Sequence, residues 1–472
     1  MPDELKPRVA IAGASGFVGR ALIRQLRTTC DVIALARATR PNEEFVQWRA
    51  CDLFNLRDAE DALQGADSAV YLVHSMLPSA RLTQASFQDL DLLCADNFAR
   101  AAVKNGVRHI VYLGGLLPAE GGQLSRHLES RFEVERTLAA YGVPVTTLRA
   151  GLIIGAGGSS FDMMARLVGR LPFMIGPRWT RSLSQAIALA DAVSLVNYAL
   201  ENPELAGQAY DIAGPDVVSY ADMLRMTGLA QGKRTRVITL PVSTAKLSLL
   251  WVSFITGAPQ ALVRPLVESL RHDMIAGDGL VLQRQASIEA MPLQLALDRA
   301  VQDEKSLARR PRRRLFDRLF PVGSRDGTQH RVFSVQRLPV PEGKDAKWIA
   351  DEYLRWLPLC IGPLLRVTVD DRRRCCFFIW PVRAPLLVLD FAPDRSSADR
   401  QLFYVTGGVL AKPASGRRAR LEFRSVLGGT ATLAAVQDFV PRLPWLIYKY
   451  TQALVHLFVM QAFARHLRDE HR

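Results

Sequence analysis

A glycine-rich segment near the start of the chain has the spacing needed to hold a phosphate group. Gly13, Gly16 and Gly19 recur every third residue, between an apolar strand-like run at 9–12 and a segment with helical spacing at 17–26. Glycines allow a tight turn and close approach of a pyrophosphate, and a helix N-terminus supplies free N–H groups and positive potential. The strand before and the helix after favour a dinucleotide site over a turn without a ligand. The candidate cofactor-binding residues of the turn are Gly13, Ser15, Gly16, Phe17, Val18 and Gly19.

A basic residue follows the second predicted strand, at 31–36. A carboxylate at this place usually binds the ribose hydroxyls of NAD, whereas a basic residue suits the 2′-phosphate of NADP. Here the strand is followed by Arg37, with Arg40 close by. We therefore predict NADP as the cofactor and Arg37 as its selector. NAD, with Arg37 as a solvated surface residue, is the alternative.

The elements that position this turn alternate between short apolar strands and helices up to about residue 215. Further strand-like runs lie at 68–73, 109–113 and 143–148, and helical segments at 87–104 and 128–140 lie between them. This alternation is typical of α/β proteins and predicts a doubly wound parallel sheet with helices on both faces. Residues 216–302 have a mostly helical pattern with one strand at 236–240, and we assign them to a helical substrate region.

The last third of the chain has a different pattern. Residues 303–345 are polar and basic, and we interpret them as a linker. Beyond them, alternation predicts antiparallel strands, half-exposed at 419–424, and then one helix to about residue 468. The six predicted strands lie at 365–369, 376–380, 386–391, 402–406, 419–426 and 430–439. The predicted organisation is a dinucleotide domain at 1–215, a substrate region at 216–302, a linker at 303–345 and an α+β domain at 346–472.

With these motifs in place, residues 8–300 resemble the short-chain dehydrogenase/reductase superfamily, in its extended or atypical, NmrA-like branch. Cys51-Asp52-Leu53 looks like the family's Asp-Leu pair after the third strand, and Tyr71 to Met76 looks like the segment where the fourth strand meets the cofactor. The resemblance implies that Asp52 contacts the adenine, with Leu53 beside it, and that His74 lies near the cofactor. The whole chain resembles fusions of such a domain to a C-terminal domain of unknown function, which implies a cofactor but no known substrate.

The family's usual catalytic residues are not found in their standard form. The family uses a Ser together with a Tyr and a Lys spaced Y-x-x-x-K, in which the Tyr supplies the proton. In this chain Gly114 and Gly115 stand where the Ser is expected, His127 replaces the Tyr and Arg131 replaces the Lys. In one interpretation His127 donates the proton and Arg131 binds the ribose or nicotinamide side. In the other, His127 is an ordinary polar residue at an exposed helix start.

These observations leave three classes of function. The first is an NAD(P)-dependent oxidoreductase, most simply NADP(H)-dependent, that acts on an unknown apolar carbonyl or enone. The second is a catalytically silent NADP-binding sensor or assembly factor. The third is a lipid-binding protein at a membrane surface, in which the dinucleotide domain is structural.

The positive charge of the chain is concentrated at its C-terminal end. The formal net charge is +14, of which residues 1–300 contribute +1 and residues 301–472 contribute +13. This asymmetry fits an anionic partner such as lipid headgroups, although solvated arginines are the alternative. The basic residues are not accompanied by a recognition motif in which aromatic residues alternate with them, so we expect no specific nucleic-acid partner. No histidine pair has metal-ligand spacing, so we expect no metal site. The six cysteines are scattered along the sequence, which fits a protein of the reducing cytosol.

Two apolar stretches, at 247–263 and 445–464, are candidates for core helices or for membrane helices. Strands followed by one long helix also resemble helix-grip domains, which enclose apolar ligands. In such a domain a cavity, or simply the core, would contain Trp445, Leu454, Phe458 and Phe463. We expect a cytoplasmic protein, with peripheral attachment to the inner face of the membrane as an alternative.

Overall fold

The chain forms two compact units, and each is built from two separate stretches of sequence. In the computed structural model, the described residues are 6–74, 82–118, 124–239, 270–277, 279–308, 331–361, 365–412 and 418–469. The first unit comprises Met1–Met76 and Cys94–Arg313, and the second comprises Leu77–Leu93 and Arg314–Arg472. The apolar stretch at 247–263 lies outside the described residues.

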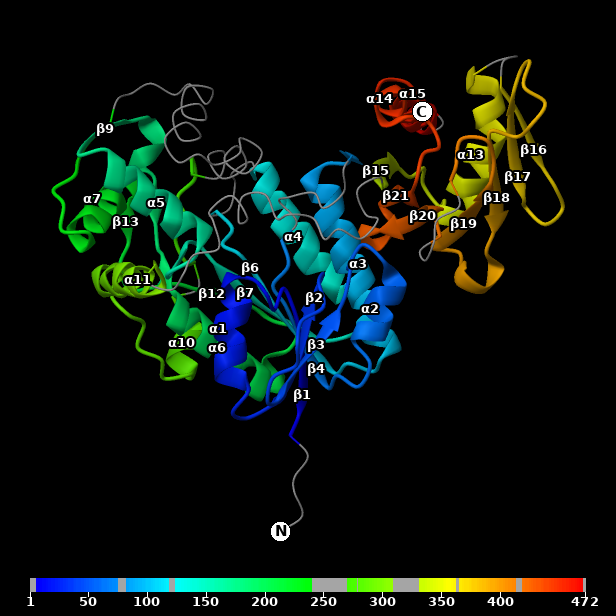
Figure 1. Cartoon of the computed structure of the whole chain (residues 1–472). Coiled ribbons are helices and arrows are strands. Elements are labelled where there is room, and N and C mark those ends of the chain that lie inside the picture. Colours follow the sequence, from blue (N-terminus) through cyan, green and yellow to red (C-terminus); the bar gives the residue numbers. More distant parts are fainter. Residues whose placement is uncertain are drawn as a thin grey trace, which may run out of the picture. The chain divides into compact units, whose positions relative to one another are not determined.

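The first unit contains a seven-stranded sheet in which all neighbouring strands are parallel (Figure 1). The strand order is β12-β7-β6-β4-β1-β2-β3, which reverses direction on either side of β1 as in doubly wound sheets. The strands are β1 (Arg8–Ala12), β2 (Asp31–Ala36), β3 (Val46–Ala50), β4 (Ser68–Tyr71), β6 (His109–Gly115), β7 (Val145–Ala150) and β12 (Ala209–Ile212).

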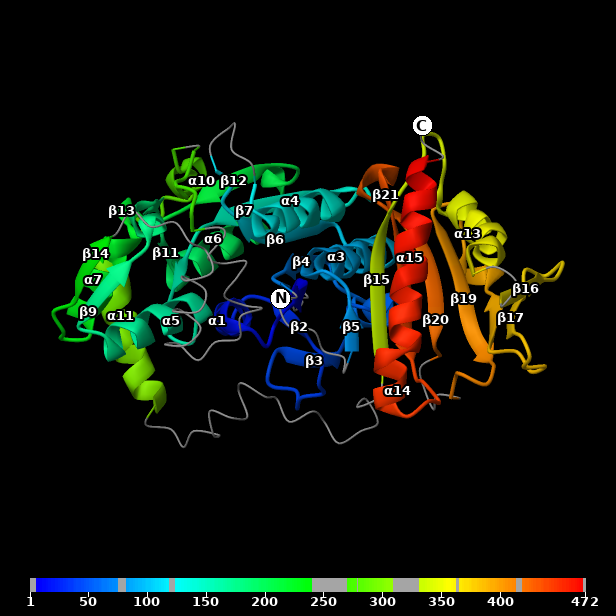
Figure 2. The same cartoon turned by 90° about the horizontal axis from the view of Figure 1, so that it is seen from above.

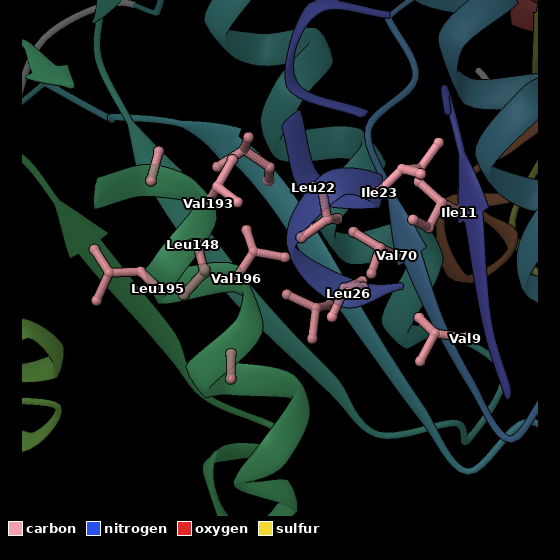
Figure 3. Close-up of a cluster of buried hydrophobic side chains, with 14 of the residues drawn as sticks. Val9, Ile11, Leu22, Ile23, Leu26, Val70, Leu148, Val193, Leu195 and Val196 are labelled. Carbon is pink, nitrogen blue, oxygen red and sulfur yellow. The ribbon is translucent and has the colours of Figure 1, made fainter. Parts of the chain in front are cut away.

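Helices cover both faces of this sheet because its buried strands are apolar on both sides. Side chains alternate along a strand, so Val9 and Ile11 of β1 join one core cluster and Ala10 and Ala12 join the other. Figure 3 shows the first cluster, which contains Leu22 of α1 and Val196 of α6 together with Val9 and Ile11 of β1. The helices are α1 (Phe17–Leu26) and α6 (Leu189–Glu201) on one face, and α2 (Leu56–Ala62), α3 (Phe87–Lys104) and α4 (Arg126–Ala139) on the other. The predicted α/β fold is therefore confirmed.

Most of the remaining elements of the first unit form a separate apolar cluster beside the sheet. The strand predicted at 236–240 is present as β14, which pairs in parallel with β9. The helices are α5 (Ser159–Arg170), α7 (Tyr220–Ala230), α10 (Val281–Gln285) and α11 (Leu293–Ala308). The short strands are β8 (Ile153–Ile154), β9 (Phe173–Gly176), β10 (Leu183–Ser184), β11 (Ile187–Ala188), β13 (Val218–Ser219) and β14 (Arg236–Thr239).

The second unit is an eight-stranded sheet with helices packed on one face (Figure 2). Its neighbours are antiparallel, except that β15 pairs in parallel with β5, a strand contributed by residues far earlier in the chain. The strand order is β16-β17-β18-β19-β20-β21-β15-β5. The strands are β5 (Leu82–Gln84), β15 (Val332–Pro339), β16 (Leu365–Val369), β17 (Cys375–Ile379), β18 (Leu387–Phe391), β19 (Arg400–Gly407), β20 (Arg420–Val426) and β21 (Ala431–Phe439).

Three features of the second unit differ from the sequence analysis. The stretch 303–345 is not all linker, because it contains the end of α11 and the whole of β15. A helix, α13 (Ala346–Ile361), precedes the six predicted strands. The final helix is interrupted at Thr451 into α14 (Trp445–Tyr450) and α15 (Gln452–Asp469). Where the chain is described, no helix combines the length and the apolar character needed to cross a bilayer.

The charged face of β20 is buried rather than half-exposed as predicted. Glu422 and Arg424 have side chains only 3% and 2% exposed, and Glu422 accepts a hydrogen bond from Arg400 Nε at 2.6 Å and others from Arg424. Burial alone would raise the pKa of Glu422, but Arg424 and Arg400 outweigh it and hold this pKa below its usual range. The alternation of apolar and charged residues does belong to an antiparallel strand, but the charges compensate one another within the protein instead of facing water.

Candidate functional site

The glycine turn joins β1 to α1 through backbone geometry that only glycine adopts easily. Gly13 has φ of +85°, in the left-handed region, and its carbonyl accepts a hydrogen bond from the Gly16 N–H at 2.9 Å. Gly16 is the N-cap of α1, and no side chain among the described residues caps this end of the helix. The N–H groups of the first turn of α1 are therefore well suited to an anion.

Gly19 brings the first turn of α1 against the end of β1. A Cβ atom at this position would lie 2.4 Å from the Gly13 oxygen and 2.7 Å from the Ala14 Cα. Contacts this short with backbone atoms leave no room for a side chain, so α1 begins in direct backbone contact with the turn. The turn is thus a cradle that side chains would fill, and it fits a pyrophosphate.

The other predicted cofactor residues stand at the carboxyl ends of neighbouring strands. Because β4, β1, β2 and β3 are adjacent and parallel, their ends meet at one edge of the sheet. Arg37 directly follows β2 and is exposed, while the Arg40 guanidinium lies 4.9 Å from the centre of the Trp48 ring. Asp52 follows β3, and its Oδ1 accepts a hydrogen bond from the Phe54 N–H at 3.3 Å. Leu53 packs against the buried core on this side of the sheet.

A cavity of about 330 Å³ lies next to the glycine turn, at the ends of β4, β6 and β7. Phe17 and Val18 line it at one side, and His74 and His127 are also lining residues. The two imidazole rings have their centres 4.9 Å apart and are inclined by 54°. The structure therefore places His127, half-buried at the start of α4, together with His74, which follows β4. The neighbouring Ser75 lies outside the described residues.

Arg131 lies one turn after His127 on α4 and also lines this cavity. Its guanidinium donates hydrogen bonds to the carbonyls of Leu113, at the end of β6, and Val73, after β4. It also lies 5.1 Å from the centre of the Tyr112 ring, whose hydroxyl donates to the Arg131 carbonyl at 3.1 Å. Arg131 thus ties α4 to the ends of two strands, and part of its donor capacity is used within the protein.

Several residues that sequence reasoning missed also line the cavity. Tyr220, the first residue of α7, is buried, and burial raises its pKa to about 12. A tyrosine hydroxyl is protonated at neutral pH even without this shift, so it is a potential hydrogen-bond donor. Ser159, Ser160 and Met274 come from other distant segments. No motif links these positions to the glycine turn, so only the tertiary structure brings them to the cavity. The described residues contain no cluster of metal-ligating side chains.

Comparison with known proteins identifies the first part of the chain. Residues 13–155 match a protein family described as NAD(P)H-binding. The chain is 31% identical over 148 residues to the auxiliary protein GraX of Staphylococcus aureus, covering 30% of this chain and 44% of that protein. It is 23% identical to a UDP-glucose 4-epimerase of Vibrio cholerae, covering 52% and 82%. It is 24% identical to an NAD(P)H azoreductase of Xenophilus azovorans, covering 55% and 85%.

Among solved structures, the chain is similar to a Citrobacter sp. triphenylmethane reductase complexed with NADP(H). The identity is 16%, the TM-score is 0.50, and the match covers 62% of this chain and 99% of the reductase. This similarity concerns the fold alone. Together with the family match, it shows that the N-terminal part of the chain contains an NAD(P)H-binding Rossmann-type domain.

Proposed function

We propose that the protein is an NADP(H)-dependent oxidoreductase acting on an apolar carbonyl or enone. The observation that carries this proposal is the cavity, which extends from the start of α1 to the paired imidazoles of His74 and His127. Its other walls are largely apolar side chains, namely Leu72, Leu113, Leu128, Leu152 and Ile153. An apolar cavity with a few converging polar groups is the usual form of a small-molecule site.

The proposal assigns residues of the chain to three parts of the cofactor. In this proposal the N–H groups at the start of α1 hold the pyrophosphate, and Arg37 binds the 2′-phosphate from the end of β2. Asp52 and Leu53 border the adenine at the end of β3. When bound, NADPH supplies the hydride. The choice of NADP over NAD rests on Arg37, because a guanidinium makes charge-assisted, often bidentate bonds to phosphate.

His127 is our candidate for the proton donor. Imidazoles exchange protons near neutral pH, and this one lines the cavity close to where α4 meets the strand ends. Arg131 is in our view a positioning residue, since its bonds to the Leu113 and Val73 carbonyls hold α4 in place beneath His127. His74 limits the orientations that the His127 ring can take, because the two rings are in contact.

The second candidate function is a silent NADP-binding sensor, and one observation favours it. The family's Tyr and Lys are replaced, and the guanidinium at the Lys position donates to backbone carbonyls. Such a protein would bind the cofactor in the same place and transfer no hydride. The two functions differ only in turnover, so a kinetic experiment separates them.

The test is NADPH oxidation with a panel of quinones, enones and aldehydes. Replacing His127 with alanine should lower kcat about 10²–10⁴-fold, the usual contribution of a general acid, and leave NADPH affinity nearly unchanged. Glu129→Gln, on the exposed side of α4, serves as the control and should keep parental kcat. Cofactor binding without oxidation of NADPH by any substrate would favour the sensor.

We further propose that the second unit attaches to an anionic membrane surface. Exposed apolar side chains recur on both terminal helices, with Leu446 and Tyr450 on α14 and Leu454 and Phe458 on α15, all more than half exposed. Exposed basic residues such as Lys449 lie on the same helices, and residues 301–472 carry a net charge of +13. Apolar side chains flanked by basic ones are typical of helices that lie in a bilayer interface.

A further inference from the structure

The second unit contains a cavity of about 210 Å³ between its sheet and its helices, apart from the dinucleotide domain. Its floor is formed by side chains of β17 to β21 and β15, among them Phe377, Leu389 and Val436. Its roof is formed by α13 and α15, through Tyr353 and Val459. Protein interiors are close-packed and contain few voids larger than a water molecule. At about 30 Å³ per water-sized group, this void has room for roughly seven such groups.

The side chains predicted to line a cavity here do not line it. Leu454 and Phe458 face outward, Phe463 is part of the core, and Trp445 packs in a neighbouring cluster. The cavity is lined instead by the residues of α15 one step around the helix, Gln452, Val455, His456 and Val459. Val455 is 56% exposed and also lines the cavity. The cavity is therefore open to solvent at this end of α15.

The polar groups of the lining are few and uncharged. His456 Nε2 and the buried Ser334 hydroxyl are 3.1 Å apart and share a hydrogen bond. Burial lowers the pKa of His456 to about 4, so its ring is neutral at physiological pH. Gln452 Oε1 is buried and has no hydrogen-bond partner among the described residues. The other lining side chains are apolar or tyrosine, and none carries a charge.

We propose that this cavity binds an apolar small molecule with one hydroxyl group, which donates a hydrogen bond to Gln452 Oε1 beside the Ser334–His456 pair. The apolar lining accepts the hydrocarbon part, and filling the void restores the contacts that an empty cavity loses. A buried acceptor without a partner is unfavourable, and a ligand hydroxyl that donates to Gln452 Oε1 would satisfy it. The same lining disfavours a carboxylate, because the described residues that line the cavity include no cation to balance its charge.

The probe for the test is N-phenylnaphthylamine, a neutral dye that fluoresces in apolar sites, added to the full-length protein. We expect saturable binding that medium-length alkanols displace and alkanoates of equal length do not. Val459→Trp should fill the cavity and weaken dye binding at least about tenfold, or 1.4 kcal/mol. The control is Gln461→Trp, at an exposed polar position of the same helix, which should bind the dye like the parent.

A second variant keeps the test decisive if Val459→Trp fails to fold. Gln452→Leu keeps a side chain of similar volume and removes the amide. The concentration of alkanol needed to displace the dye should therefore rise about tenfold. Displacement by the corresponding chloroalkane should not change. Parental dye binding in folded Val459→Trp, or equal competition by alkanol and alkanoate, would overturn the proposal. The proposed oxidoreductase activity is independent of this result, since its site lies in the first unit.

Discussion

Replacing Gly19 with alanine tests the most constrained contact in the dinucleotide site. The added carbon would lie 2.4 Å from the Gly13 oxygen and 2.7 Å from the Ala14 Cα, and both are backbone atoms that cannot rotate away. Relief requires α1 to move away from the turn, and overpacking of this kind costs about 1–3 kcal/mol. At roughly 2–4 °C per kcal/mol, the Tm of the first unit should fall by about 2–12 °C.

The same movement should weaken cofactor binding by a comparable free energy. Hydrogen bonds to a charged group contribute about 1.5–3 kcal/mol each, so displacing one N–H from the pyrophosphate raises Kd about 10–150-fold. Isothermal titration with NADPH measures Kd, and differential scanning fluorimetry measures Tm. The matched control is Gly169→Ala in α5, where the nearest atom to the new carbon is at 3.7 Å. That variant should keep the parental Kd and gain slightly in stability. A folded Gly19→Ala protein with parental Kd and Tm would refute this account of the turn.

Three other perturbations have defined outcomes. Arg37→Ala should weaken NADP binding by about 1.5–3 kcal/mol in titration calorimetry and leave NAD nearly unchanged, and a parent with equal affinity for both cofactors would contradict the NADP preference. Glu422→Gln should destabilise the second unit by about 3–5 kcal/mol in urea unfolding, because it leaves two buried guanidinium groups without their carboxylate. The pKa of Glu422 in the folded protein lies below its ordinary 4.5. The ionised carboxylate therefore stabilises the second unit above about pH 4.5, and this stabilisation is lost as the pH falls further. The Glu422→Gln variant should lose this pH dependence of unfolding. Co-sedimentation of the protein with anionic liposomes should decrease as salt shortens the Debye length from about 10 Å at 0.1 M to about 3 Å at 1 M. The double variant Leu454→Glu with Phe458→Glu should also reduce it. Recovery of the parent protein in the supernatant at low salt would exclude attachment.

The fold of the first unit was predictable because its signals are local. The strands β1 and β2 and the helix between them follow from apolar runs and glycine spacing within 30 residues of sequence. The six strands from β16 to β21 were also predicted to within a few residues, because each has its own alternation. The prediction missed α13 and β15. For β15 the reason is composition, because its eight strand residues stand at the edge of a stretch of polar and basic residues that is typical of a linker.

The sequence alone determined the elements whose cause lies in neighbouring residues, above all the glycine turn, which needs no distant partner to adopt its shape. The tertiary structure decided everything that depends on residues far apart. It placed β5, from residues 82–84, beside β15 in the second unit, and it brought Tyr220 to the cavity that contains His127. It also determined which face of α15 looks inward, because the break at Thr451 and the packing of α13 set the rotation of that helix. Apolar periodicity identifies a helix with an apolar face, but where apolar side chains lie on more than one face, as Leu454, Phe458 and Val459 do on α15, only the packing partners choose the buried one.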